Sequence, residues 1–157
     1  MSSVPKPYAQ GTDVPVERSR AELETILHKH GATSIGMLRD QAGVVLVFEM
    51  SGRRIKQSIA NPDPAQYQLT DKRQRRSPEA VKAAVEAELK RRWRALVLII
   101  KAKLELVASG GSTFEVEFLP HVLLPNGETV AEAMLPRIAQ AYQTGSMPRL
   151  SLGAGGS

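Results

Sequence analysis

The chain has 157 residues, of which 42% are apolar, 4% are aromatic and none is cysteine, and its formal net charge is +5. This length and apolar content fit one domain with an aliphatic core, and the lack of cysteine excludes disulfides, thiolate metal ligands and cysteine nucleophiles. The longest uninterrupted apolar run, residues 95–100, is too short to span a bilayer, and the first residues show no signal-peptide pattern. We therefore expect a cytoplasmic protein that does not contact a membrane.

The chain begins with a tail and a helix. Residues 1–14 are rich in Pro, Ser and Gly, a composition typical of a flexible tail. A helix is expected over residues 17–30, in which Ser19 and Glu22 have the spacing of a capping box. Gly31 follows where a helix commonly ends in a left-handed residue.

Three strand-like segments follow, with short turns between them. Residues 33–39 form a weak strand pattern, whereas 43–50 are β-branched, aromatic and apolar on both faces for most of their length. Residues 53–59 alternate, with isoleucines on one face and Arg54, Lys56 and Ser58 on the other. Together the segments predict an antiparallel three-stranded meander with a basic strand face.

A long loop and a long helix come next. Residues 61–77 are polar, open with two prolines and end in a basic run, which predicts a long functional or disordered loop. Ser77 as N-cap and Pro78 in the first turn start a helix that can continue to Ala108, a rod of about 45 Å. Residues 93–107 of this helix are mostly apolar, which indicates either a central core helix or a contact that forms a homo-oligomer.

The last third of the chain predicts two helices separated by a turn. A short helix or turn is expected at 112–119, where Ser112 and Glu115 again have capping-box spacing. A Pro-Asn-Gly turn at 125–127 precedes a last helix over 129–144 with the same capping spacing, and the proline inside it, Pro136, predicts a kink or a junction.

These elements predict an α+β fold of order α-β-β-β-α-α. We expect residues 15–145 to form a single domain between the tail at 1–14 and a second tail at 146–157. A meander with helices on one face leaves its other face open for a ligand.

The positive charge is concentrated in one segment. Residues 72–103 carry eleven bases and three acids (+8), residues 1–71 carry eight of each, and residues 104–157 carry two bases and five acids (−3). Such segregation is the footprint expected for a polyanion partner, although a solvated helix face, with its bases paired to Glu86, Glu88 and other acids, also explains it. The candidate phosphate contacts combine the loop, the middle of the long helix and the basic strand face: Arg54, Lys56, Lys72, Arg73, Arg75, Arg76, Lys90, Arg91 and Arg94.

Two aromatic residues lie near these bases. Tyr67 precedes the basic run and is a candidate for stacking on an unpaired base, although packing within the loop explains it as well. Trp93 shares helical spacing with Leu89, Leu96 and Ile100, which favours a core position over base stacking.

No residue pattern indicates catalysis or a cofactor. His28 and His30 are two residues apart on a helix and point in different directions, which is poor metal-ligand geometry, and no nucleophile elbow is present. Glu115, Glu117 and His121 are the only nuclease candidates, and metal-dependent nucleases use several clustered carboxylates. We therefore expect a non-enzymatic protein without a metal or cofactor.

Four blocks of the sequence resemble a family of small proteins encoded by tailed phages and prophages. The blocks are VPVERSRAELETILHKHGA, FEMSGRRIK, RRWRALVLIIKAKLELVASG and TFEVEFLPHVLLPNGETVAEAMLPRIAQAY, and the resemblance covers roughly residues 14–150. The resemblance implies a phage protein that acts in the host cytoplasm and whose gene lies among early, DNA-metabolism genes. It supplies no site residue. The β-β-β-α core is also similar in outline to phage single-strand annealing proteins, a similarity of fold alone.

The sequence thus predicts a phage nucleic-acid-binding protein that acts in replication or recombination. Single-stranded DNA is the favoured ligand because no recognition-helix motif for duplex grooves is present. The alternative is a non-enzymatic phage inhibitor that uses the same basic surface to bind a host defence protein or a charged signalling nucleotide.

Overall fold

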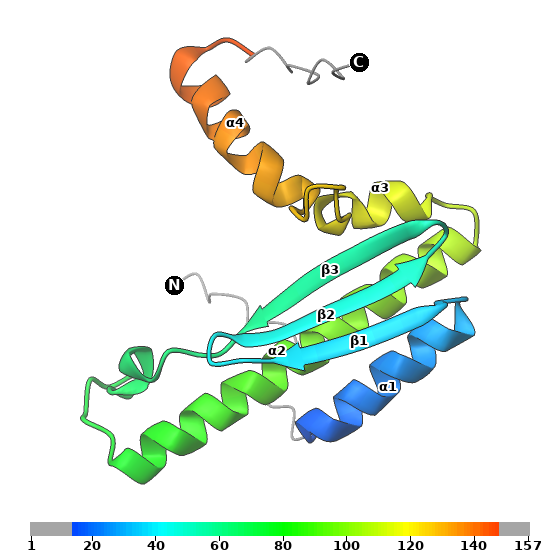
Figure 1. The fold of residues 1–157 in the computed structure, drawn as a ribbon. Coiled ribbons are helices and arrows are strands. Elements are labelled where there is room, and N and C mark those ends of the chain that lie inside the picture. Colours follow the sequence, from blue (N-terminus) through cyan, green and yellow to red (C-terminus); the bar gives the residue numbers. More distant parts are fainter. Residues whose placement is uncertain (1–13, 148–157) are drawn as a thin grey trace.

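The computed structural model describes residues 14–147, so most of both expected tails lies outside the described residues. It confirms the α+β fold: two helices cover one face of a three-stranded sheet, and short helical segments follow (Figure 1). In chain order the elements are α1 (Val16–Lys29), β1 (Ser34–Arg39), β2 (Gly43–Met50), β3 (Arg53–Ala60), η1 (Pro64–Tyr67), α2 (Pro78–Ala108), α3 (Phe114–Phe118), η2 (Leu119–His121) and α4 (Val130–Thr144).

The sheet is the predicted antiparallel meander in the order β1-β2-β3. Phe48 pairs with both Ile35 and Ile55, so this row of apolar residues faces the helices. The alternate row on β2 points to the open face, where Val47 pairs with Lys56. Ser51 and Gly52 join β2 to β3 with φ of 52° and 72°, the two positive values that a tight type I′ hairpin turn requires.

The core lies between the helix-covered face of the sheet, α1, α2 and α3. Trp93 is 1% exposed, which confirms its predicted core position and excludes it as a base-stacking platform. The apolar second half of α2 supplies much of this core, so burial within the chain accounts for most of its apolar residues. The most deeply buried members are Leu23, Leu27, Leu46, Phe48, Ile55, Trp93, Val97, Ile100, Leu104 and Phe118.

Residues 122–129 form a short hairpin that pairs with the outer edge of β3, a contact not predicted from the sequence. Val122 forms a bridge with Ile55, and the Leu123 N–H donates to the Arg54 carbonyl at 2.8 Å. The predicted Pro-Asn-Gly turn is confirmed at its tip, where the Gly127 N–H donates to the Leu124 carbonyl at 2.9 Å. This hairpin covers part of the sheet edge and positions the start of α4.

Two of the three predicted capping boxes are wrong. α1 begins at Val16 and its N-cap position is Pro15, so Ser19 lies inside the helix with a buried hydroxyl that has no hydrogen-bond partner among the described residues. At α3 the cap is Thr113 rather than Ser112, because the Thr113 hydroxyl accepts from the Val116 N–H. The box at the start of α4 is confirmed by reciprocal hydrogen bonds between Thr129 and Glu132.

α4 extends away from the rest of the molecule (Figure 1). None of its residues is buried, and Pro136 lies within a helix that is continuous from Val130 to Thr144. Among residues 14–147, no helix is both long enough and apolar enough to cross a membrane.

Candidate nucleic-acid interface

The predicted loop at 61–77 contains η1 and a hydrogen-bonded turn, which we call the basic loop (residues 68–76). Within it, the Arg73 N–H donates to the Thr70 carbonyl at 2.8 Å, and the Gln74 N–H donates to the Thr70 hydroxyl at 3.1 Å. Leu69 and Arg75 form a bridge across the loop. Arg73 has φ of 58°, a left-handed conformation that closes the turn and is strained for a residue other than glycine.

Arg76 is a structural residue at the base of this loop. Its Nη1 donates to the carbonyls of Tyr67, at 3.0 Å, and Leu69, at 3.1 Å. Tyr67 is partly buried at the end of η1, which packs against α2. Arg76 therefore holds the loop together through one guanidinium nitrogen, and Arg76 and Tyr67 are both partly exposed.

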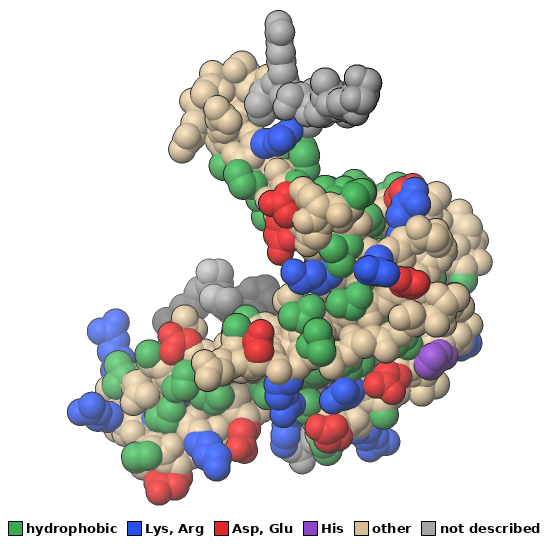
Figure 2. Space-filling model, in the orientation of Figure 1, with side chains coloured by type: hydrophobic (Ala, Val, Ile, Leu, Met, Phe, Trp, Pro, Cys, Tyr) green, Lys and Arg blue, Asp and Glu red, His purple; other side chains and the backbone are tan. Residues whose placement is uncertain are grey.

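The remaining bases of the loop project into solvent. Lys72, Arg73 and Arg75 are exposed, and their side chains form no salt bridge with any residue from 14 to 147. Residues 68–82 contain five bases and two acids, a local charge of +3. Figure 2 shows Lys and Arg side chains, with a few acids between them, at the end of the molecule formed by this loop and the start of α2.

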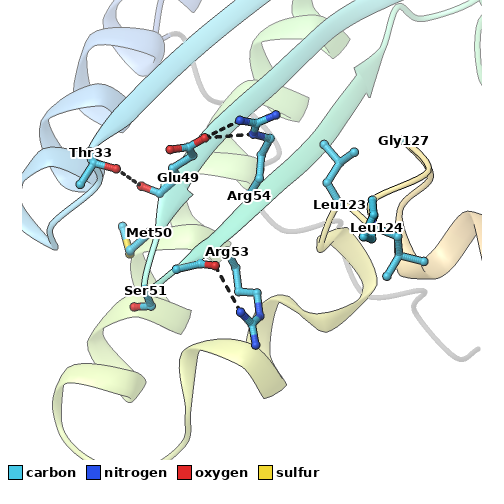
Figure 3. Close-up of a pocket in the computed structure, with 11 residues that line it drawn as sticks. Thr33, Glu49, Met50, Ser51, Arg53, Arg54, Leu123, Leu124 and Gly127 are labelled. Atoms are coloured by element: carbon cyan, nitrogen blue, oxygen red, sulfur yellow. Dashed lines mark hydrogen bonds and ion pairs between the residues drawn. The ribbon is translucent and has the colours of Figure 1, made fainter. Parts of the chain in front are cut away.

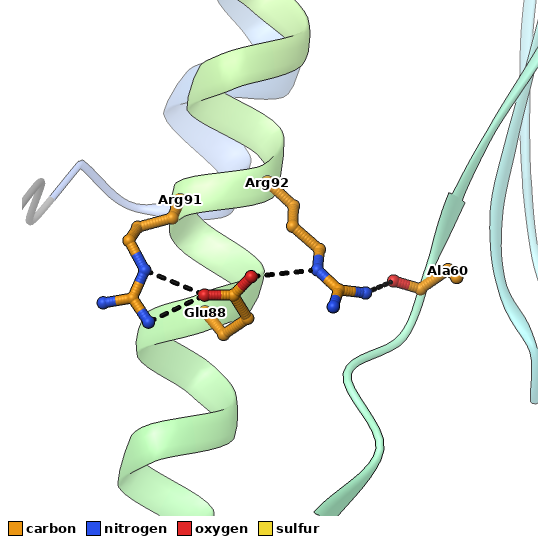
Figure 4. A network of polar contacts seen from close by, with 4 residues as sticks. All are labelled: Ala60, Glu88, Arg91 and Arg92. Atoms are coloured by element: carbon orange, nitrogen blue, oxygen red, sulfur yellow. Dashed lines mark hydrogen bonds and ion pairs between the residues drawn. The ribbon is translucent and has the colours of Figure 1, made fainter. Parts of the chain in front are cut away.

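The bases in the middle of α2 are neutralised by acidic side chains (Figure 4). Glu88 accepts hydrogen bonds from Arg91, at 2.9 Å, and Arg92, at 3.1 Å, and Arg92 also donates to the Ala60 carbonyl at 2.7 Å. Burial alone would raise the pKa of Glu88, but the hydrogen bonds from the two guanidinium groups outweigh it and lower that pKa. The ionised carboxylate thus offsets the repulsion between neighbouring cations.

The other two bases of this region are also engaged. Arg94 forms an ion pair with Glu22 of α1 and thereby joins the two helices. Lys90 is partly buried and also has an interaction partner. For this cluster the geometry therefore matches the interpretation of a paired helix face.

The hypothesis that Arg54 and Lys56 share one surface with the bases of α2 is wrong. They project from the open face of the sheet, whereas α2 covers the opposite face, so the sheet lies between the two groups. Arg54 pairs with Glu49 at 2.7 Å, and Lys56 lies 3.7 Å from Glu132. The predicted contacts are consequently divided among the basic loop, the middle of α2 and the open sheet face.

A cavity of about 540 Å³ lies where the β2–β3 turn meets the 122–129 hairpin (Figure 3). Arg53 and Arg54 line it, but Arg53 is paired with Glu115 at 2.8 Å and Arg54 with Glu49. Sequence reasoning missed this cavity because its walls come from segments about 70 residues apart along the chain. Its lining combines apolar and paired charged groups: Thr33, Glu49, Met50, Ser51, Gly52, Arg53, Arg54, Leu123, Leu124, Pro125 and Gly127.

A second cavity, of about 610 Å³, lies beside the basic loop. Arg75 and Arg76 contribute its polar wall, and Pro78 and Val81 at the start of α2 contribute its apolar wall, with Gln68 completing the lining. A concave surface with an exposed guanidinium at its rim suits an anionic group attached to a planar or apolar body.

The weak nuclease candidates do not form an assembled acid cluster. Glu115 is paired with Arg53, and burial and the nearby Lys103 ammonium lower the pKa of His121. Within residues 14–147, no group of three or more His, Asp or Glu side chains is placed to hold a metal ion.

No family model, curated protein or solved structure matches this chain.

Proposed function

We propose that this is a phage protein that binds single-stranded nucleic acid, with DNA favoured, through the basic loop, in replication or recombination. One observation carries the proposal: Lys72, Arg73 and Arg75 are exposed on a hydrogen-bonded loop without a carboxylate partner among the described residues. Most of the other predicted contacts are paired. Phosphate groups would supply the missing negative charge.

Several features favour a single strand over a duplex. The basic loop is a short turn, and the second half of α2 is packed in the core beside α1, so neither resembles a helix presented to a major groove. Tyr67 is partly exposed beside the loop and Leu69 is exposed within it. An apolar or aromatic surface next to cations suits unpaired bases, which stack while their phosphates are neutralised.

The cavity beside the loop supports a second candidate, the binding of a charged signalling nucleotide by a phage inhibitor. Arg75 lies at this cavity, and Pro78 and Val81 form an apolar wall. A nucleotide would place its phosphates at the guanidinium group and its base against that wall. The single strand and the nucleotide would both contact Arg75, so an experiment must separate the two candidates by the length of the ligand.

A gel-shift titration with labelled oligonucleotides tests the first candidate. Three phosphate contacts predict a slope of about −2 for log affinity against log salt, or about twentyfold weaker binding at about 200 mM than at about 50 mM. Replacing Lys72, Arg73 and Arg75 together with Gln should remove most of this slope. Affinity should rise with strand length, whereas a nucleotide site saturates with a mononucleotide and is insensitive to length.

The matched control removes three exposed bases that lie away from the loop: Arg18, Lys29 and Lys101. This variant has the same net charge as the loop variant, so equal losses in both would mean that overall charge, not the loop, binds the strand. The absence of binding to single strands and duplexes at about 50 mM salt would overturn the nucleic-acid proposal.

A further inference from the structure

α4 presents an apolar side that nothing within the described chain covers. Leu135, Ile138 and Tyr142 fall on one side of the helix by their spacing, and they are 61%, 44% and 87% exposed. An isolated helix of 15 residues is only marginally stable in water. This helix therefore needs a surface against which its apolar side can pack.

The open face of the sheet carries a second uncovered apolar patch, a strip on β1 and β2 that lies beside the charged Arg54 and Lys56 of β3. Leu38 is 70% exposed there, and its cross-strand neighbour Val45, together with Val47, is partly exposed on the same face. Gly36 lies between Leu38 and the start of β1 and adds no side chain to this face. Figure 2, which views the open face, shows hydrophobic side chains both over the sheet and along α4.

The two surfaces match in size. β2 has eight residues, a length of about 26 Å, and α4 has 15 residues, a length of about 22 Å with a diameter of about 10 Å. Three strands span about 14 Å. The open face therefore has room for one helix of this length.

The α4 of a chain does not lie on that chain's own sheet. Its first turn is fixed beside the edge of β3 by the Val130 N–H, which donates to the Val122 carbonyl at 3.0 Å. Lys56 lies 3.7 Å from Glu132 at the same point. From there the helix runs away from the sheet (Figure 1).

We propose that two copies of the chain form a two-fold dimer by exchanging α4, so that each helix packs its Leu135–Ile138–Tyr142 side on the open sheet face of the other copy. Two-fold symmetry makes this contact twice. Counting both surfaces of both contacts, the footprint of the helix projects to roughly 900 Å², close to the roughly 1,000 Å² that a specific interface buries.

The charge of α4 favours a protein surface over the other classes of partner. The helix contains one base, Arg137, and one acid, Glu132. A membrane-surface helix carries a strongly basic polar face, and a nucleic-acid surface needs several cations. The dimer proposal is independent of the nucleic-acid proposal, because it uses none of the basic-loop residues.

Native mass spectrometry and light scattering test the proposal directly. The wild-type chain should have twice the monomer mass of 17.1 kDa. Ile138→Asp on the helix and Val45→Asp on the sheet should each give a monomer. The matched control is Gln140→Asp, which adds the same charge on the opposite side of α4 and should remain dimeric. Far-UV circular dichroism establishes that each variant is folded.

Chemical crosslinking tests directly whether α4 is exchanged between two chains. This test does not depend on whether the aspartate variants fold. The chain has no cysteine, so Leu38→Cys can be placed in one tagged chain and Tyr142→Cys in another. A short bis-maleimide should join the two different chains. A monomeric wild type, a dimer that survives both aspartate substitutions, or a double-cysteine chain that crosslinks only within itself would overturn the proposal.

Discussion

Arg92 of α2 donates a 2.7 Å hydrogen bond to the backbone carbonyl of Ala60, the last residue of β3. The same guanidinium binds Glu88, which also accepts from Arg91. One carboxylate thus holds two adjacent cations, and one of these fixes the end of the sheet to the long helix. The most basic stretch of the sequence is therefore, in this part, a structural element.

Replacing Glu88 with Gln should destabilise the fold by about 1–2 kcal/mol, because two cations lose their shared counter-charge. Urea denaturation at neutral pH measures this loss. Glu86→Gln is the control, since Glu86 is exposed and no described contact involves its side chain. The folded-state pKa of Glu88 is lowered, so the stability it provides is lost as the pH falls below 4.5 towards that value, and the two proteins should converge there. A constant difference at acidic pH would contradict this assignment.

His121 should make the protein less stable at mildly acidic pH. Burial and then the Lys103 ammonium lower its pKa below 6.5 in the folded state, so the unfolded chain binds the proton more readily. The free energy of unfolding should therefore fall as the pH drops through 6.5. Chemical denaturation at about pH 7.5 and about pH 5.5 should show a smaller difference for His121→Gln than for the wild type. An equal difference would mean that other groups cause the pH dependence.

The fluorescence of Trp93 should depend on the packing of the core and should not respond to a bound ligand. Because it is the only tryptophan and is 1% exposed, its emission should be blue-shifted and poorly quenched by iodide. Saturating oligonucleotide should leave that emission unchanged. Trp93→Ala should cost about 3–5 kcal/mol of stability. Strong quenching on addition of a single strand would show that a ligand reaches the indole ring.

Arg73→Gly should separate binding from stability. Arg73 has φ of 58°, and glycine adopts this conformation with less strain, so stability should be unchanged or should rise by up to about 1 kcal/mol. Affinity for single strands should nevertheless fall, because one phosphate contact is lost. Thermal unfolding and a gel-shift titration of the same preparation measure both effects. Undiminished binding by a stable variant would remove Arg73 from the interface.

The fold could be predicted from the sequence where local signals agree. The apolar, β-branched run of β2 and the alternating residues of β3 specify the meander. The cap at Ser77, Pro78 and the glycines after Ala108 specify both ends of the long helix. Ser19 misled the prediction, because its residue type suits a cap but its position lies inside a helix that begins earlier. Residue type alone cannot show that a hydroxyl is buried.

The candidate site was less predictable because ion pairing joins residues far apart in the chain. Arg94 pairs with Glu22, 72 residues away, and Arg53 pairs with Glu115, 62 residues away. Counting charges gives the net value of a segment but not which cations are already neutralised. The turn that exposes Lys72 and Arg73 was also missed, since it closes on a left-handed arginine where a glycine would be the usual signal.

The 31 residues of α2 give it a length of about 46 Å. The basic loop adjoins its first turn, and α3, the 122–129 hairpin and α4 follow its last turn (Figure 1). The helix works as a rigid spacer between the basic loop, for which we propose a polyanionic ligand, and α4, for which we propose a second copy of the chain. Each end can therefore be altered, labelled or tethered to a surface while the other keeps its shape.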